Sequence, residues 1–349
     1  MRILHTADLH LREDAPETID ALDAVLEAAR TRDADLVTVG GDLFDRPTDV
    51  DALRPALRER FADAGREVLV VPGNHDAAAF RRNLDFGPTV DPLVGAPCDS
   101  RRVGEATVVG VPYTSEFTDE LYAALREAAP ADGPGVLLLH CTLDVGFDRD
   151  AVGTEETTRY CPVSRSVLGE LGYDAVLAGH IHAGLDRRRL PGGGHFVYPG
   201  SPCSHTTAET GPRHAVVYDT AADALEPVRL PTFYHDRRRW TVRPGEGAAV
   251  LDEVDRWVAD READDCEYRV AVDGFVRDEA AFGERLATIV PGDRLTNEVR
   301  DVGPVLDHEL YERFERRLAE REDVDDPEAV RAVVTRALSD LLIAGEVRP

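Results

Sequence analysis

Short apolar runs and longer amphipathic stretches alternate through the first half of the chain. Five runs, which begin near residues 3, 35, 67, 136 and 174, are too short for helices and end in turn-forming residues, as buried strands do. Residues 17–30 and 50–64 carry apolar side chains at helical spacing, and Pro16 stands where the first of these helices would begin. The pattern predicts strands that alternate with helices, which is typical of an α/β fold.

The pattern changes after residue 182. Residues 185–190 and 195–198 are typical of a hairpin that turns at Gly192, Gly193 and Gly194, because two strand-like runs flank a glycine turn. Residues 215–218 and 225–230 predict a second antiparallel pair. Alternating strands and helices followed by antiparallel strands predict two sheets flanked by helices.

The chain is predicted to form three parts. A boundary near Pro231 makes residues 1–230 the main domain. Residues 231–303 alternate strand-like and helical stretches and predict a small α+β unit, and residues 304–349 predict a helical tail. The last helix of the tail has an apolar stripe, which either packs on its own domain or offers a face to a partner helix.

The composition indicates a globular protein with an extreme charge. Hydrophobic residues make up 43% of the 349, and 40 basic against 67 acidic residues give a net charge of −27. The sequence contains no lysine, so every basic residue is an arginine. An acidic surface without lysine is typical of proteins that stay soluble in concentrated salt, so we expect a protein from the cytoplasm of a halophile. The alternative is an arginine-rich protein of a mesophile. In molar salt charges are screened beyond about 3 Å, so the acidity does not exclude DNA as a substrate.

Cysteine usage argues against a disulfide or zinc framework, and hydropathy argues against a membrane protein. The five cysteines are odd in number, scattered, and contain no Cys-x-x-Cys pair, which favours buried thiols in a reducing compartment over a disulfide or zinc framework. No apolar run approaches the length of a membrane span, and no charged-then-apolar leader precedes the first run. We therefore expect a cytoplasmic protein that does not enter a membrane.

The candidate chemistry lies where the five apolar runs end. The turns read Asp8-x-His10, Gly41-Asp42-x-x-Asp45, Gly73-Asn74-His75-Asp76, His140, and Gly179-His180-x-His182. One Asp-x-His alone is more often a solvated turn than a ligand pair. In an α/β sheet, however, ligands bind beyond the carboxyl ends of the strands, and here five strands bring carboxylates, imidazoles and an amide to that place. The turns together predict a metal site.

The order of these motifs and their glycines resembles the calcineurin-like metallophosphoesterase superfamily over roughly residues 1–225. The resemblance implies a four-layer sandwich of two mixed sheets between helices, and a pair of divalent metal ions. Carboxylate and amide oxygens mixed with imidazole suit manganese, iron or zinc better than calcium. We expect manganese, with iron, zinc or magnesium as alternatives.

The resemblance also implies a role for each motif residue. Asp42 would bridge the two ions, and His75 would act on the leaving oxygen as general acid or charge stabiliser, with its imidazole fixed by Asp45. One ion would take Asp8, His10 and His182 as its other ligands. The second would take Asn74, His140 and His180. Glycines at 41, 73 and 179 would let the backbone turn sharply beside the ions.

Several residues near the motifs have less specific explanations. Asp76 is expected to cap a following helix, and His5 to be a core histidine. Arg46 is either a phosphate clamp or a surface charge. The arginine runs 187–189 (Arg187, Arg188 and Arg189) and 237–239 either contact DNA phosphates or are solvated. The remaining histidines are expected not to bind metal: His195, His205, His214, His235 and His308.

Several motif sequences of the chain are similar to those of the SbcD-type nucleases, which repair DNA double-strand breaks. The likeness rests on residues 1–11, Gly-Asp-Leu-Phe-Asp45, Pro-Gly-Asn-His-Asp76, Ala-Gly-His-Ile-His182 and Tyr-Pro-Gly-Ser-Pro202. It implies a DNA exo- or endonuclease with a capping domain at 231–303, a tail that docks on a coiled-coil ATPase, and a homodimer. The insertion 142–162 matches no family motif. A small-molecule phosphatase, a cyclic-nucleotide phosphodiesterase and a non-catalytic scaffold subunit stay as alternatives.

Overall fold

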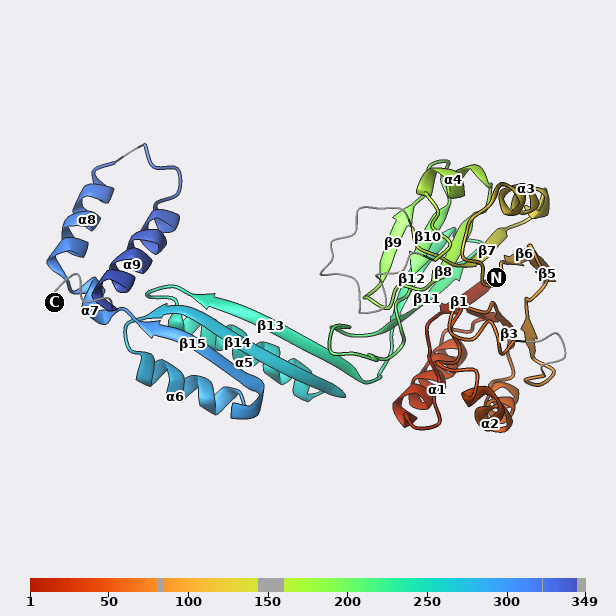
Figure 1. Ribbon diagram of the computed structural model, residues 1–349, viewed down its shortest axis with the longest axis horizontal. Helices are drawn as coiled ribbons and strands as arrows, with labels where there is room; N and C mark the ends of the chain where they lie inside the picture. The colour runs from red at the N-terminus through yellow and green to blue at the C-terminus, as the bar shows by residue number, and fades with distance from the viewer. Residues whose placement is uncertain (81–84, 144–159, 322, 344–349) are drawn as a thin grey trace. The chain divides into compact units, whose positions relative to one another are not determined.

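The computed structural model describes residues 1–80, 85–143, 160–321 and 323–343 (Figure 1). The chain divides into two compact units, residues 1–235 and 236–349. This division lies five residues beyond the predicted boundary after residue 230. The functions predicted for residues 231–303 and 304–349 stay predictions.

The first sheet of residues 1–235 runs in the order β12-β11-β1-β2-β3-β4. Four strands are parallel, and β11 and β12 extend the sheet antiparallel beyond β1. The strands are β1 (Arg2–Thr6), β2 (Leu36–Val39), β3 (Glu67–Val70), β4 (Val90–Pro92), β11 (His214–Asp219) and β12 (Ala224–Arg229). The sheet is therefore mixed, as predicted.

The second sheet runs in the order β5-β6-β7-β8-β10-β9. Its four inner strands are parallel, and each edge strand pairs antiparallel with its neighbour. The strands are β5 (Asp99–Val103), β6 (Ala106–Gly110), β7 (Gly135–His140), β8 (Ala175–Gly179), β9 (Asp186–Arg189) and β10 (His195–Tyr198). The predicted hairpin across the triple glycine is the β9–β10 pair.

Side-chain alternation along the strands produces four layers. In β1, Ile3 belongs to the apolar cluster between the two sheets, whereas Leu4 belongs to the cluster under α1 (Pro16–Thr31) and α2 (Asp49–Ala64). A third cluster joins the outer face of the second sheet to α3 (Asp119–Ala128) and α4 (Arg165–Glu170). Successive side chains of a strand point to opposite faces, so each sheet buries both of its faces. The predicted αββα sandwich is confirmed.

His5 makes polar contacts across the inner layer. His5 is buried between the sheets, where its Nδ1 lies 3.0 Å from Thr38 Oγ1 on β2 and its Nε2 lies 3.1 Å from the carbonyl oxygen of Ala178 on β8. Burial lowers the pKa of the imidazole from 6.5 to about 4, because the charged form is poorly solvated there. His5 is the core histidine that we expected, and it joins the two sheets directly.

Residues 236–349 build a separate core. A sheet in the order β13-β14-β15 packs against two helices through Trp240, Trp257 and Tyr268, whose rings meet edge to face. The elements are β13 (Tyr234–Val242), α5 (Gly247–Glu262), β14 (Cys266–Val276), α6 (Glu279–Ile289) and β15 (Leu295–Asp301). The predicted small α+β unit is therefore present, and β15 is a strand that the sequence did not indicate.

The predicted helical tail is also present. It consists of α7 (Gly303–Leu306), α8 (Glu309–Ala319) and α9 (Pro327–Ile343). Leu338 of α9 packs against a small cluster that contains Val305 and Tyr311, while Val333 is 68% exposed. No helix in the described part of the chain is long and apolar enough to cross a membrane. The insertion predicted at 142–162 falls mostly on residues 144–159, which lie outside the described residues.

Candidate metal centre

All seven predicted ligands gather where strand ends of both sheets meet. From the first sheet, Asp8 and His10 follow β1, Asp42 follows β2, and Asn74 follows β3. From the second sheet, His140 ends β7, and His180 and His182 follow β8. Of these side chains, Asn74 is half-buried and the other six are buried. The five turns that carried the prediction therefore form one cluster.

The backbone at these strand ends is strained. Asp8, His10, Asp42 and His180 have positive φ angles of 55°, 45°, 50° and 103°. Residues other than glycine seldom adopt this conformation, which costs on the order of 1–3 kcal/mol each. Four such residues in one cluster indicate that the fold holds their side chains against local backbone preference.

Two glycines are required by crowding. A Cβ on Gly41 would lie 2.1 Å from His140 Nδ1, and φ at Gly41 is +108°. A Cβ on Gly73 would lie 2.1 Å from Asp42 Oδ1. Both distances are far below van der Waals contact, so the motif glycines allow the turns to approach the acidic and imidazole side chains.

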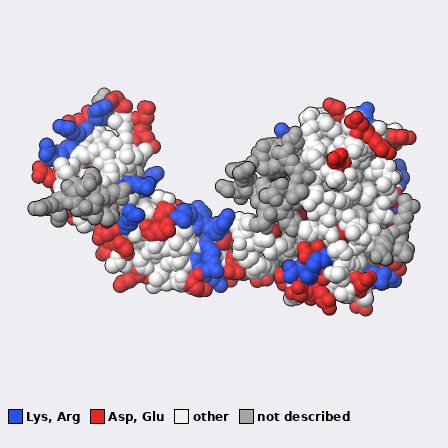
Figure 2. All heavy atoms as spheres, in the orientation of Figure 1, with Lys and Arg blue, Asp and Glu red and all other residues white. Residues whose placement is uncertain are grey.

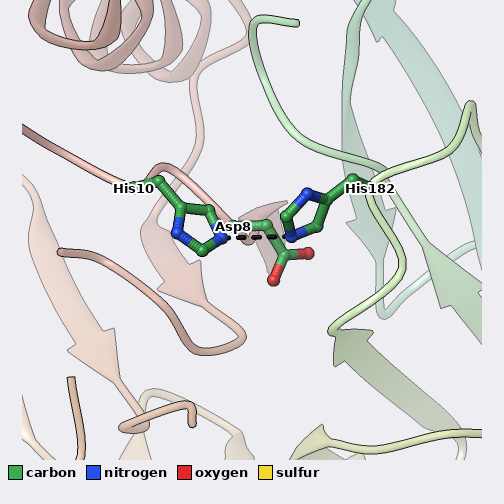
Figure 3. Close-up of side chains that lie close together, drawn as sticks. All are labelled: Asp8, His10 and His182. Carbon is green, nitrogen blue, oxygen red and sulfur yellow. Dashed lines mark hydrogen bonds between the residues drawn. The ribbon is translucent and has the colours of Figure 1, made fainter. Parts of the chain in front are cut away.

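One half of the cluster is formed by Asp8, His10 and His182, whose ligand atoms lie within 4.8 Å of one another. Figure 3 shows the two imidazoles facing each other, with the carboxylate of Asp8 beside them. The Nε2 atoms of His10 and His182 are 3.1 Å apart. Each ring has its Nδ1 next to a carboxylate oxygen, Asp45 Oδ1 for His10 and Glu209 Oε1 for His182, both at 3.3 Å. Because a carboxylate accepts a hydrogen bond from Nδ1–H, the proton of each neutral ring lies on Nδ1 and the two Nε2 atoms present lone pairs to each other.

The other half is formed by Asp42, Asn74 and His140. His140 Nδ1 donates to the carbonyl oxygen of Gly40 (3.0 Å), so its Nε2 faces Asn74 Oδ1 at 2.9 Å and Asp42 Oδ2 at 3.3 Å. Asp42 Oδ1 accepts from the backbone N–H of His75 (2.9 Å), but its buried Oδ2 has no hydrogen-bond donor among the described residues. An orphaned carboxylate oxygen in such a place needs a cation.

The charges within the cluster also favour a bound cation. Burial lowers the pKa of His140, but the carboxylates of Asp42 and Asp8 outweigh it and raise that pKa to about 9. Burial also raises the pKa of Asp8. The carboxylates therefore favour positive charge inside the cluster, which a bound cation would supply. The set of oxygen and imidazole donors fits divalent ions such as manganese, iron or zinc.

Among the predicted ligands, Asp42 lies between the two halves of the cluster, and His180 contacts Asp8 through its backbone. Asp42 Oδ2 also lies 3.8 Å from His10 Nε2, so this carboxylate stands between the two halves, as expected for a bridge. His180 donates its backbone N–H to both oxygens of Asp8 (3.0 and 3.1 Å). The His180 ring meets the His140 ring edge to face, with centroids 5.2 Å apart. Its role as a ligand stays a prediction.

His75 and Asp45 are arranged differently from the expectation. His75 Nδ1 donates to the backbone carbonyl of Asp45 (3.1 Å), while the Asp45 carboxylate lies 3.7 Å from it. That carboxylate is nearer to His10, at 3.3 Å. The hydrogen bond from His75 Nδ1 therefore goes to the main chain, because the turn after β2 brings a carbonyl to the ring, and the Asp45 side chain supports the predicted ligand His10. The His75 side chain remains 24% exposed at the edge of the cluster.

The expectation for Asp76 is wrong. Residues 74–79 form turns, and the buried carboxylate of Asp76 accepts from the backbone N–H groups of Gly73 (2.8 Å) and Phe44 (3.2 Å). It therefore does not cap a helix. Instead it ties the turn after β3 to the turn after β2, which fixes Asn74 relative to Asp42.

Sequence reasoning missed two buried charges behind His182. Glu209 contacts the ring of His182, and Arg213 donates to its backbone carbonyl. Neither residue lies in a motif at the end of an apolar strand, so no pattern in the sequence singles them out. His205, expected not to bind metal, donates from Nε2 to the carbonyl oxygen of Asp8 (3.1 Å) and lies beside His10.

The arginines proposed to contact phosphate have acidic or carbonyl partners. Arg46 pairs with Asp49 (2.9 Å) and Asp14 (3.0 Å). Within β9, Arg188 pairs with Asp186, Arg189 with Asp223, and Arg187 with the carbonyl oxygen of Leu225. These contacts would have to be exchanged for phosphates. Figure 2 shows that most of the visible, described surface of residues 1–235 is uncharged, with acidic and basic side chains next to one another along its lower edge.

Two mixed sheets that bring acids and histidines together at their strand ends define a metal-dependent phosphoesterase, a class of hydrolase. Comparison with known families gives the same answer: the model of the calcineurin-like phosphoesterase family matches residues 1–184, more than half of the chain. The chain belongs to that family.

The chain is also similar in sequence to individual proteins of known name. The chain is 28% identical over 289 residues to the DNA double-strand break repair protein Mre11 of Aeropyrum pernix, covering 73% of this chain and 66% of that protein. It is 28% identical over 295 residues to the protein of the same name in Halobacterium salinarum, covering 78% and 70%. The D component of the Escherichia coli nuclease SbcCD is 37% identical over 89 residues, 23% of this chain and 22% of that one. The chain therefore spans about two thirds of the first relative's length and far less of the third's.

Proposed function

We propose that the chain is a dinuclear-metal phosphodiesterase that cleaves DNA during repair. The observation that carries the DNA part is the length of the similarity to proteins named for double-strand break repair. It extends over 289 residues, whereas the phosphoesterase family model ends at residue 184. The similarity therefore includes sequence beyond the family's common segment.

The dinuclear part rests on the two groups of ligand atoms. Asp8, His10 and His182 would hold one ion, Asn74, His140 and His180 the other, and Asp42 would be shared. The unsatisfied Oδ2 of Asp42, between His10 and His140, supports that sharing. When bound, two divalent ions supply Lewis-acid chemistry: they neutralise charge on a phosphate and make water more acidic.

The chain's own residues would do the remaining chemistry. His75 is half-buried at the edge of the cluster, and because its Nδ1 donates to the Asp45 carbonyl, its Nε2 is the nitrogen that can face a substrate. Protonated there, it would give its proton to the oxygen that leaves the phosphate. Asp45 would hold His10 in place.

An aromatic edge beside the cluster supports a nucleic-acid substrate. The ring of Tyr160 meets that of His180 edge to face (5.3 Å), and Tyr113 meets Tyr160 in the same way (5.8 Å). Both tyrosines are half-buried, and Tyr113 follows β6, the neighbour of β7 in the sheet. Tyrosine rings can contact unstacked bases regardless of sequence. Arg46, Arg187, Arg188 and Arg189 are proposed phosphate contacts.

We also propose a partner protein, an oligomeric state, a cellular setting and a physiological ion for the chain. Residues 304–349 would dock on a coiled-coil ATPase, for which the exposed Val333 on α9 is the supporting feature. The chain would form a homodimer and work in the cytoplasm. The net charge of −27 and the similarity to a Halobacterium salinarum protein support a halophilic setting. Manganese is the proposed physiological ion.

Substrate competition tests this proposal. The full chain, supplied with Mn²⁺ in high salt, would be given labelled duplex ends, single-stranded DNA, and a chromogenic phosphodiester. We expect cleavage of DNA as well as of the small ester, and loss of both with a chelator. Hydrolysis of the small ester alone would overturn the DNA assignment and favour a small-molecule or cyclic-nucleotide phosphodiesterase. No hydrolysis of any substrate, despite bound ions, would favour a scaffold.

A further inference from the structure

His182 is held on the side that faces away from the proposed ion. Its Nδ1 lies 3.3 Å from Glu209 Oε1, and its Nε2 lies 3.1 Å from His10 Nε2. A carboxylate can only accept a hydrogen bond, so the contact places the proton on Nδ1 and the lone pair on Nε2. Glu209 thereby determines which nitrogen of His182 faces the cluster.

Glu209 has no coordination capacity left for an ion of its own. It is 2% exposed, and its Oε2 accepts from Ser201 Oγ (2.9 Å) and from the backbone N–H of His205 (2.9 Å). Its Oε1 accepts from His182 and, at 3.4 Å, from Thr206 Oγ1. The carboxylate is thus fully occupied by protein donors and can affect an ion only through His182.

Arg213 holds the main chain of the same residue. This arginine is 1% exposed and donates to the carbonyl oxygens of His182 and Ser201 and to Ser201 Oγ, the last two at 2.9 Å. A buried guanidinium with several fixed acceptors is a rigid support, because its donors lie in one plane. Ring and backbone of His182 are therefore fixed from separate sides.

The two halves of the cluster differ in how their imidazoles are held. The ring of His140 is oriented by the backbone carbonyl of Gly40, which no side-chain substitution removes. The ring of His182 depends on a side chain from a loop 27 residues further along the chain. A substitution at Glu209 should therefore affect one half of the cluster and spare the other.

We propose that Glu209 is a positioning residue of the metal centre, which fixes His182 as a ligand of the ion held by Asp8 and His10, while Arg213 anchors the His182 backbone. This inference rests on the proposed dinuclear function. Removing a carboxylate that orients a metal-binding histidine weakens metal binding by roughly 10–100-fold. Here the loss should fall on one of two ions.

The test is Mn²⁺ binding to the full metal-free chain, measured by calorimetry, with electron paramagnetic resonance to distinguish paired from single Mn²⁺. The wild type should bind two ions. Glu209→Ala should weaken one of them by about 10–100-fold and leave the other unchanged, so that the paired-manganese signal disappears at limiting Mn²⁺. Glu209→Gln, which keeps an acceptor oxygen without the charge, should weaken the same ion less and serves if the alanine variant does not fold.

The matched control is Asp223→Asn. It changes another histidine–carboxylate pair of the same unit, in which His195 Nε2 lies 3.1 Å from Asp223 Oδ1, and it should leave both ions bound as in the wild type. Two ions of wild-type affinity in both Glu209 variants would overturn the inference and leave the function standing. Equal weakening of both ions would assign Glu209 a general structural role and also overturn it. A wild-type chain that binds one ion or none would overturn the proposed function, and the inference with it.

Discussion

The two compact units of the chain bury different kinds of side chain. Residues 1–235 bury aspartates, a glutamate, an arginine and several histidines, most of them near the strand ends where the candidate metal centre lies. Among the described residues of 236–349, the buried polar side chain is Thr335, and the core is apolar and aromatic. Buried charge is costly unless it is paired or binds a metal.

The difference shows where chemistry and stability conflict. In residues 1–235, left-handed backbone at Asp8 and Asp42 and an orphaned carboxylate oxygen destabilise the fold locally and are kept because they build the site. In the described part of residues 236–349 no residue other than glycine has a positive φ, and the buried polar atom without a hydrogen-bond partner is the indole nitrogen of Trp240 rather than a charged group. Apolar packing therefore accounts for most of the stability of this unit. Substitutions in the two units should therefore have separable effects.

The largest effect is expected from His75→Ala. Loss of a proton donor should lower the turnover of DNA and of a chromogenic diester by about 10²–10⁴-fold, because general acid catalysis contributes that much. Both Mn²⁺ ions should stay bound, since the ring lies at the edge of the cluster. Asp42→Asn is the matched variant and should lose turnover together with bound metal. Loss of metal from His75→Ala would show that His75 is a ligand.

A core substitution in the second unit should separate stability from chemistry. Leu286 of α6 is fully buried, so Leu286→Ala should lower the free energy of unfolding of residues 236–349 by about 2–5 kcal/mol. The chain's two tryptophans, Trp240 and Trp257, both lie in this core, so their fluorescence follows its unfolding alone.

Turnover of the small diester by Leu286→Ala should stay within about twofold of the wild type, because the buried contacts of Leu286 belong to the second core. Leu57→Ala, at an equally buried position of α2, is the control that should destabilise residues 1–235 instead. Unchanged tryptophan fluorescence transitions in Leu286→Ala, or a large loss of turnover, would contradict the separation of the two units.

A smaller effect concerns acid stability of the first unit. The pKa of His5 is lowered by burial from 6.5 to about 4, so the unfolded chain binds a proton at a higher pH than the folded one. Stability should therefore be complete above pH 6.5 and fall as the pH drops toward 4, by up to about 3 kcal/mol from this residue. His5→Gln should remove that part of the pH dependence. Urea denaturation of the metal-free wild type and of His5→Gln, at pH 7 and at pH 4.5, measures the free energy of unfolding. An equal loss of stability between the two pH values in the wild type and in the variant would refute the prediction.

The strands that carry ligands could be predicted because apolar runs and polar turns coincide there. The strands at 36–39, 67–70 and 135–140 are mostly apolar. The first two end at Val39 and Val70, shortly before glycine turns, and the third ends at His140. Edge strands such as β5, with the sequence Asp-Ser-Arg-Arg-Val, and β15, Leu-Thr-Asn-Glu-Val-Arg-Asp, have one exposed polar face and few apolar positions. Their pairing depends on neighbours far away in the sequence, which periodicity does not reveal.

The clustering of the motif residues could likewise be predicted, but the contacts that support them could not. Glu209 lies in a loop without periodic pattern, and only the fold brings it to His182. The contact between Asp45 and His75 has a similar origin: the sequence places the two residues near each other, but the backbone determines that the Asp45 carbonyl lies closer to the ring than its carboxylate does. Contacts that pass through the main chain leave no signature in residue types.

The division of the ligands between two sheets has a thermodynamic consequence. Asp8, His10, Asp42 and Asn74 follow strands of one sheet, and His140, His180 and His182 belong to the other. His5 also makes direct polar contacts between the two sheets. An ion bound by both sets is a cross-link through the middle of the sandwich that the unfolded chain lacks. Metal at about a hundred times its dissociation constant would add about 2.7 kcal/mol per ion to the stability of the fold. The melting temperature of residues 1–235 would then follow the free metal concentration, so bound ions would also be part of the architecture.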